Sequence, residues 1–378
     1  MHGKGTLVKF VAFVGLFLFG QIAYSHSQEG TSLEPWDSTK HKSEKESGGK
    51  EKFDAGKLII EHVTDNHEWH IITLGQTHVT IPLPVILFFD GHLYSFWSNR
   101  FNNSSHSYKG FVIPETGADR GKIIRAGTLE PGTNRLPVYD FSITKTVFAV
   151  LFSSLLLILI FLSVANTYRS NPGKAPHGLQ NMMEPMILFI RDDVAKSSIG
   201  EKKYEKYVPY LLTIFFFIFF NNLLGIIPLF PGGANVTGNI AVTGVMAACT
   251  LVITTFSANR HYWIDIINTP GVPWWLKFPI PLMPIVEFIG VLTKPFVLMV
   301  RLFANMLAGH IVILGFISII FIFGGMAVVL GYSVSVVSLV FMVFMDLLEI
   351  LVALIQAYVF TLLSALYFGL AIAEPEHH

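Results

Sequence analysis

The feature that most limits the fold of this chain is a pair of very long apolar segments in its last third. Residues 285–323 form a segment of 39 residues, residues 327–373 form one of 47, and Gly324 and Gly325 separate them. As continuous helices they would be about 58 and about 70 Å long, whereas a perpendicular membrane span needs only about 20 residues. Each segment therefore either breaks into two spans or forms one tilted helix. Few loop-forming residues interrupt either segment, so we expect two long, steeply tilted helices.

Three further uncharged stretches are long enough to cross a membrane, near residues 146–168, 208–230 and 238–258. Pro-Gly-Gly at 231–233 divides the last two, which should form a hairpin. Only 14% of the residues are charged and 52% are hydrophobic, whereas a soluble globular chain has about 25% charged residues. The sequence therefore predicts an all-α polytopic membrane protein with about five membrane helices. They would occupy a membrane domain at 143–373, followed by a short tail at 374–378.

The N-terminal part of the chain is expected to lie outside the membrane. Residues 1–25 have the pattern of a cleaved signal peptide. Lys4 and Lys9 precede a ten-residue apolar core, and Ala23 and Ser25 form a small-residue cleavage site after it. A retained anchor is the alternative, but the core is short for a bilayer of about 30 Å. Residues 26–55 are polar and predicted to be disordered. The short β-rich runs of 56–142 predict a small, strand-containing external domain.

Basic residues set the expected orientation of the spans. The loop after the first span is the most basic one beside a span, and the positive-inside rule places it in the cytoplasm. The N-terminal domain is then outside, in agreement with a signal peptide, and the C-terminus is cytoplasmic. Within this loop, residues 179–194 carry an apolar stripe that suits an amphipathic helix at the membrane surface. A short core helix of a cytoplasmic loop fits the same pattern.

Neither metal nor disulfide chemistry is expected. Cys249 is the one cysteine of the chain, so an internal disulfide and a cysteine-based zinc site are excluded. The external domain holds six histidines, and His67 and His70 have a His-x-x-His spacing. Without a second matching pair, solvated or hydrogen-bonded histidines are favoured over a metal site. The 26 basic and 26 acidic residues balance, so no net field attracts nucleic acid.

The two long segments contain a small set of charged residues. They are Glu287, Lys294, Arg301, Asp346 and Glu349, and His310 adds a group that can also ionise. A charge at the bilayer centre costs at least about 2.5 kcal/mol on insertion scales, so such residues face protein or water and are functional candidates. The alternative is that they only hold helices together through ion pairs and hydrogen bonds. For Glu287 and Asp346 the two interpretations are equally supported.

The spacing of the polar residues places them on stripes. Glu287, Lys294 and Arg301 recur every seven residues, and Asn305 follows one turn later. On a helix they fall within about 40° of one line. Glu349 and Gln356 in the last segment are likewise seven residues apart. Each long helix is therefore expected to carry one polar stripe.

Arg301 is the strongest functional candidate. It lies midway along its segment, beside Leu302 and Phe303, with no acid four residues away. A central arginine without a partner in its own helix implies a carboxylate supplied by another element. Lys294 is a weaker candidate, because a lysine near the cytoplasmic end of a helix can snorkel to the surface.

These residues point to a family. Lys294-Pro295, followed by Arg-Leu-Phe-Ala-Asn-Met-Leu-Ala-Gly-His at 301–310, closely resembles the arginine-bearing helix of F-type ATP synthase a subunits. The stretch 349–360, with Gln356 and Tyr358, resembles the last helix of that family. Residues 221–225 and 237–243 resemble its middle hairpin. The resemblance extends over residues 140–372, and the external domain is larger than the usual N-terminal segment of the family.

The resemblance implies a non-catalytic stator subunit that carries protons past a rotor. In that family the arginine faces a ring of c subunits, each with one carboxyl group in mid-membrane, between two aqueous half-channels. Expected partners are the c ring, the peripheral-stalk b subunits, the F1 head and lipid, in a bacterial inner membrane and without a cofactor. The implied proton-translocating residues are Arg301 facing the ring, His310 and Glu349 in the external half-channel, Glu287 near the cytoplasmic one, and Asn305 and Gln356 beside the arginine, with Lys294 and Asp346 as further candidates.

The sequence departs from the family pattern at two places. Bacterial members often carry an acid at the position of His310 and a histidine at that of Glu349, and here the two are exchanged, as in mitochondrial relatives. Gly225 stands where many members have an acid, so we assign it no channel role. On an ideal helix His310 lies about 180° from Arg301, which places it on the half-channel side and not toward the rotor.

Two other classes of function were weighed. A stand-alone ion channel or secondary transporter also needs buried charges, but transporters usually show paired repeats, and this sequence shows none. A membrane metalloenzyme would need a motif such as His-Glu-x-x-His, which is absent from the sequence.

Overall fold

The computed structural model describes residues 56, 65–74, 77–101, 107–114, 121–126, 138–170, 172–173, 175–227, 232–268 and 282–373. The predicted signal peptide at 1–25, the tail at 374–378 and the polar leader at 26–55 lie outside these residues. The described chain divides into two compact units. Of the described residues, one unit contains those within 150–308 and 348–373, and the other contains those within 56–149 and 309–347.

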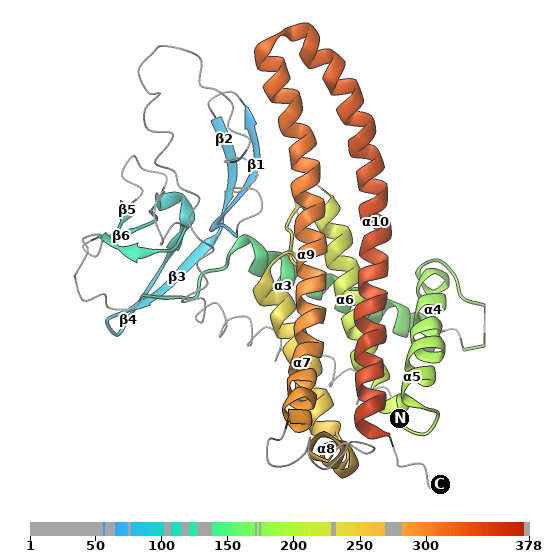
Figure 1. The fold of residues 1–378 in the computed structure, drawn as a ribbon. Coiled ribbons are helices and arrows are strands. Elements are labelled where there is room, and N and C mark those ends of the chain that lie inside the picture. The colour runs from blue at the N-terminus through green and yellow to red at the C-terminus, as the bar shows by residue number, and fades with distance from the viewer. Residues whose placement is uncertain are drawn as a thin grey trace. The chain divides into compact units, whose positions relative to one another are not determined.

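The described residues before 145 form three small antiparallel sheets (Figure 1). Strands β1 (Glu68–Leu74) and β2 (Thr77–Pro82) pair with each other. Strands β3 (Pro84–Phe89), β4 (His92–Trp97) and β8 (Tyr139–Asp140) form a sheet in the order β4-β3-β8. The third sheet has the order β5-β6-β7, with β5 at Ser107–Tyr108, β6 at Phe111–Val112 and β7 at Ile124–Arg125. The prediction of a small β-containing N-terminal region is confirmed.

The core of this region comes from the alternation of β3. Val85, Leu87 and Phe89 point to one side of the sheet and are buried, as expected for a strand whose side chains alternate between two faces. They pack with Phe101 of the 3-10 helix η2 (Ser98–Phe101) and with Phe111 of β6. This cluster joins the second and third sheets, so a few aromatic side chains hold the region together.

The sheet region is tied directly to the first residues of helix α3 (Lys145–Ser170). The first amides of a helix have no partner inside it, and here the chain before β1 supplies two. The Asp65 carboxylate accepts a hydrogen bond from the Thr146 amide at 3.0 Å, and the Asn66 carbonyl accepts one from the Lys145 amide at 3.0 Å. Trp69 of β1 packs edge-on against Phe148, with ring centroids 5.7 Å apart.

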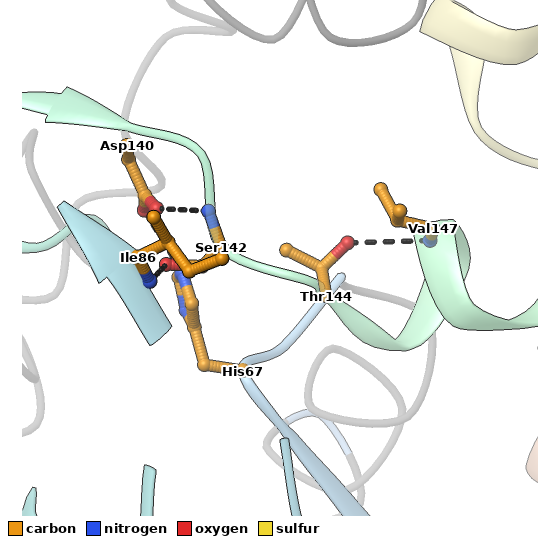
Figure 2. Close-up of polar contacts among 6 residues, drawn as sticks. All are labelled: His67, Ile86, Asp140, Ser142, Thr144 and Val147. Carbon is orange, nitrogen blue, oxygen red and sulfur yellow. Dashed lines mark hydrogen bonds and ion pairs between the residues drawn. The ribbon is translucent and has the colours of Figure 1, made fainter. Parts of the chain in front are cut away.

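A second set of polar contacts fixes the segment between β8 and α3 (Figure 2). His67 Nε2 lies 2.9 Å from Asp140 Oδ2, and Asp140 Oδ1 accepts a hydrogen bond from the Ser142 amide at 2.9 Å. The Ser142 hydroxyl in turn accepts one from the Ile86 amide of β3 at 3.1 Å. Thr144 Oγ1 caps the helix by accepting from the Val147 amide at 3.4 Å. The start of α3 is therefore held from both β1 and β3.

Five described helices are long and apolar enough to cross a membrane. They coincide with the predicted segments and are α3, α6 (Val208–Ile226), α7 (Ile240–Ser257), α9 (Leu282–Met326) and α10 (Val328–Ile372). Figure 1 shows α9 and α10 as two long antiparallel helices joined by a short turn. Each has 45 residues, which corresponds to about 68 Å.

The boundary between the two long helices differs from the prediction. Helix α9 continues through Gly324 and Gly325 to Met326, and the interruption falls at Ala327. Glycine is needed here for close approach, because a Cβ on Gly331 of α10 would lie 2.7 Å from the Gly324 Cα. The glycines thus let the helices meet near the turn without breaking α9.

The loop between α3 and α6 forms one bent helical segment. It comprises α4 (Leu179–Phe189), the π-helix η4 (Ile190–Lys196) and α5 (Ser197–Ile199), followed by the 3-10 turn η5 (Tyr204–Lys206). Met183 and Ile190 of the predicted apolar stripe are buried, but Met182 and Phe189 are exposed. A further short helix that the sequence analysis did not predict, α8 (Arg260–Ile267), follows α7.

Polar side chains connect three of the membrane helices in the first unit. The Tyr210 hydroxyl of α6 lies 2.7 Å from Thr250 Oγ1 of α7, which is 3.5 Å from Ser364 Oγ of α10. Tyr207 and Phe368 stack with centroids 5.1 Å apart, and Phe161 of α3 meets Phe216 of α6 at 5.0 Å. Because apolar surface gives helices no preference for one another in lipid, such contacts contribute to the choice of partners.

The C-terminal end of α10 is also fixed. The Asn259 amide and side chain donate hydrogen bonds to the Ala371 and Ile372 carbonyls at 2.8 and 2.9 Å. Lys203 Nζ donates to the Ile372 carbonyl at 3.3 Å. These donors satisfy carbonyls that a helix end leaves open, and the lysine also suits the negative end of the helix dipole.

Candidate functional site

Helix α9 presents Arg301 on its exposed side. Leu298, Leu302 and Met306 form a buried line centred about 100° around the helix from Arg301, while Arg301 and Asn305 are exposed. Among the residues that the structure describes, no carboxylate lies within ion-pair distance of the Arg301 guanidinium. A guanidinium on an otherwise apolar helix can pair with a carboxylate that another chain supplies.

Helix α10 has Glu349 and Gln356 on its buried side. Glu349 and Gln356 are both 5% exposed, and Ala353 and Ala357 beside them are fully buried. These small residues allow neighbouring helices to approach closely. The predicted stripe of α10 therefore faces protein, whereas Arg301 and Asn305 of the α9 stripe face outward.

The middle of α9 is held by the connection between α6 and α7. Asn235 in that connection donates from Nδ2 to the Met306 carbonyl at 3.4 Å, and its Oδ1 accepts from the Gly238 amide at 2.8 Å. Thr237 donates to Asn222 of α6 at 2.5 Å. Asn235, which lies between the two stretches that resemble the family hairpin, thus contacts α9 close to Arg301, because Met306 is only five residues further along.

The start of α9 contributes to a small, mostly apolar cavity. Lys294 Nζ lies 5.8 Å from the centroid of the Tyr367 ring of α10, a cation–π contact. Burial raises the pKa of the Tyr262 phenol of α8, and the nearby negative charge of Glu287 raises it further. The cavity is bounded by α7, α8, α9 and α10, and its lining comprises Leu251, Thr254, Tyr262, Val291, Lys294, Pro295, Tyr367 and Leu370.

The structure distributes the predicted site residues over both units. Arg301, Asn305, Glu349 and Gln356 fall in the first unit, as do Glu287 and Lys294, whereas His310 and Asp346 belong to the second. Glu287 and Lys294 are brought to one region, around Tyr262 and the cavity. Within the described part of the chain, no group of three or more His, Cys, Asp or Glu side chains is placed to hold a metal ion.

Sequence reasoning missed three residues at this site. Asn235, Tyr262 and Tyr367 are uncharged, and neither tyrosine lies in a motif quoted for the family resemblance. Their contacts join different helices, so they follow from tertiary packing. A weak indication for Tyr262 was available, because Arg260, His261 and Asp265 form a polar cluster directly after an apolar span.

Comparison with known proteins agrees with this architecture. A family model described as ATP synthase A chain matches residues 147–369. A second family model, described as Domain of unknown function (DUF8433), matches residues 58–141. The first match covers the five candidate membrane helices apart from a few terminal residues, and the second covers the sheet region.

Curated relatives agree with the first match. ATP synthase subunit a of Chloroherpeton thalassium is 44% identical over 246 residues, which cover 63% of this chain and 69% of the relative. ATP synthase subunit a 2 of Prosthecochloris aestuarii is 47% identical over 243 residues, with 63% and 71% covered. ATP synthase subunit a of Myxococcus xanthus is 42% identical over 243 residues, with 63% and 76% covered. With a family model matching more than half of its length and these relatives alongside, the chain belongs to the ATP synthase A chain family, the family of ATP synthase subunit a.

Proposed function

We propose that Arg301 is the residue of this stator subunit that meets the carboxyl groups of a rotating c ring. The chain is a multi-pass membrane protein and a non-catalytic component of an ATP synthase. The observation that carries the proposal is the exposure of Arg301 on a long apolar helix, with no acid of the described chain paired to it. Leaving a cation in that position is costly in lipid, so a partner from outside the chain is expected.

The chemistry of the pairing explains coupling. A neutral carboxyl group moves through lipid at far lower cost than a carboxylate. The positive charge of Arg301 favours the ionised form of a carboxyl group that arrives beside it. Each ring site therefore has to release its proton near Arg301 and take up another after passing it. The fixed positive charge also blocks direct proton flow between the two half-channels.

Two half-channels would lead to the ring from opposite sides. His310 and Glu349 serve the external half-channel in this proposal, and Asp346 lies in the same helical hairpin. In this proposal Glu287 and Lys294 serve the cytoplasmic half-channel, and Lys294 lines the small cavity beside Tyr262. Asn305 and Gln356 lie close to Arg301 along the two helices and would adjust its hydration.

The proposed topology follows from the charges of the loops. The chain spans a bacterial inner membrane, with the sheet region on the periplasmic side. The basic loop at 169–206 and the C-terminus lie on the cytoplasmic side. Helices α9 and α10 are tilted, because about 68 Å of apolar helix exceeds the bilayer thickness. Helix α4 lies at the cytoplasmic surface with Met182 and Phe189 in lipid. The proposed partners are the c ring, b subunits of the peripheral stalk and, through the stalk, the F1 head.

The test is the variant Arg301→Ala in reconstituted vesicles that contain the whole ATP synthase. ATP-driven proton pumping and ATP synthesis should be lost, while ATP hydrolysis by the released catalytic head persists. Arg301→Lys should also fail to couple, because lysine loses its proton more readily when desolvated. Near-normal coupled synthesis by Arg301→Ala would refute the proposal. Proton transport by the purified chain without a ring would instead indicate a stand-alone channel.

A further inference from the structure

The sheet β4-β3-β8 carries an exposed apolar face. Five large apolar side chains are exposed in the described chain before α3, and all five belong to this face. We call it the aromatic face, and it consists of Phe88 of β3, Leu93 and Trp97 of β4, Tyr139 of β8 and Phe141 just after it. Their exposed fractions are 40, 68, 58, 39 and 42% in that order.

Strand register places these residues on one side of the sheet. Phe88 is paired with Leu93 on one neighbouring strand and with Tyr139 on the other. Directly opposite residues of antiparallel strands point to the same face, and the Phe88 and Tyr139 rings are 6.3 Å apart. Phe141 continues the row, since its amide donates to the Ile86 carbonyl at 2.8 Å. Trp97 is paired with Pro84 at the end of the sheet.

Both sides of this sheet are therefore apolar. Val85, Leu87 and Phe89 already form the buried side. An antiparallel sheet with one face in water normally alternates apolar and polar residues, whereas the outward positions here carry no acidic or basic side chain. A contiguous exposed apolar patch of this kind marks an interaction surface.

The position of the face identifies what covers it. Phe141 precedes Lys145, the first residue of membrane helix α3, by four residues, a reach of at most about 14 Å. The connection is not a free linker, because Ile143 donates to the Pro84 carbonyl at 3.0 Å and Lys145 to the Asn66 carbonyl at 3.0 Å. Tryptophan and tyrosine are the residues enriched where a protein meets the headgroup layer.

We propose that the aromatic face lies against the headgroup region of the leaflet in which α3 begins. The sheet region would then sit on the membrane surface, with Trp97 and Phe141 nearest the helix and Leu93 at the far end of β4. This role concerns the attachment of the region to lipid and does not depend on the proposed proton path.

Accessibility of a spin label in vesicles tests the proposal. The full chain carries Cys249→Ala, so one new cysteine can be labelled in phosphatidylcholine vesicles that contain no other protein. Leu93→Cys is the decisive position, because it is the residue of the face furthest along β4 from α3. Ser95→Cys is a second labelling position on the same side of β4. It replaces a small exposed residue, so it should leave the fold intact even if Leu93→Cys does not. Lys122→Cys, exposed and outside the face, is the control.

At Leu93 and Ser95 the ratio of relaxation by oxygen to relaxation by a water-soluble nickel complex should be several-fold higher than at Lys122. Equal nickel accessibility at all three positions would overturn the proposal. A second result would also overturn it: a label that the nickel complex reaches in vesicles of the isolated chain but not in the assembled ATP synthase. That result would mean that another subunit covers the aromatic face.

Discussion

At the scale of single residues, the structure separates charges that look alike in the sequence. Arg301 and Glu349 both interrupt apolar helices, yet Arg301 is exposed and Glu349 is buried. An exposed cation on an apolar helix needs a partner from outside the chain, while a buried acid faces neighbouring helices. The first arrangement suits contact with a moving subunit, and the second suits a path inside the protein.

The contact between His67 and Asp140 leads to a prediction for the sheet region. Burial alone would raise the pKa of Asp140, but the hydrogen bond and charge of His67 and the hydrogen bonds from Ser142 lower it below its usual value. His67→Ala should reduce the local stability around residues 139–147 by about 1–3 kcal/mol, because the half-buried carboxylate loses its partner. Hydrogen exchange of peptides from this segment measures the loss.

The control for that experiment is His92→Ala, since His92 is exposed on β4. The pH dependence has a defined sign: a lowered pKa means that the Asp140 contribution is present at neutral pH. It is lost as the pH falls below the ordinary value of 3.8 and through the lower folded value. Equal exchange in the two variants at neutral pH would show that the pair does not hold the junction.

Sequence reasoning at this scale identified charges but not their surroundings. Arg301 and Glu349 stand out because a charge is rare in a membrane helix. The partner of His67 could not be predicted, because Asp140 is 73 residues away and the contact depends on the strand register. The role of Asn235 was hidden for the same reason, since its partner is the Met306 carbonyl.

At the scale of helices and strands, the pattern of apolar segments predicted the main elements well. Long apolar runs predicted all five candidate membrane helices, because length and hydropathy decide that assignment. The turn between α9 and α10 was placed too early, since glycines in a helix can serve close packing as well as chain reversal. Helix α8 was missed because its eight residues are too few to show a period.

The contact between α5 and α10 leads to a second prediction. A Cβ at Gly369 would lie about 2.0 Å from the Ser198 carbonyl oxygen, so Gly369→Ala has to push the bent segment away from α10. The variant should lose about 1–3 kcal/mol of stability, as overpacked sites do. Thermal unfolding in detergent, followed by the reactivity of Cys249 with a fluorescent maleimide, reports the change. Gly290→Ala is the matched control, because nothing lies within 4 Å of its Cβ. Equal melting of both variants would refute the packing argument.

The exchanged pair His310 and Glu349, one on α9 and one on α10, leads to a third prediction. Along the chain, His310 is 17 residues before Ala327 and Glu349 is 22 after it. An apolar residue at either position should slow ATP-driven proton entry, because a histidine and an acid can relay protons near neutral pH. The double variant His310→Glu with Glu349→His should recover more pumping than either single exchange. A double variant no better than the worse single one would contradict a functional pair.

At the scale of the whole molecule, the chain combines two parts that match different family models. The helical part matches the ATP synthase A chain, and the sheet region matches a domain of unknown function. Asp65 and Asn66 accept hydrogen bonds from the first amides of α3 and so join the sheet region to the start of the first span. The sequence predicted both parts, because their compositions differ, but the aromatic face required the strand register.

Disulfide formation tests the proposed orientation of Arg301 toward the c ring. In a Cys249→Ala background, Asn305→Cys lies one turn from Arg301 on the same exposed side of α9. Leu292→Cys is an equally accessible control, since Leu292 is exposed and lies about 180° around the helix from Arg301. Each is combined with a cysteine beside the membrane carboxyl group of the c subunit and oxidised in intact membranes. We predict a cross-link from Asn305→Cys and none from Leu292→Cys. A cross-link from Leu292→Cys alone would contradict it.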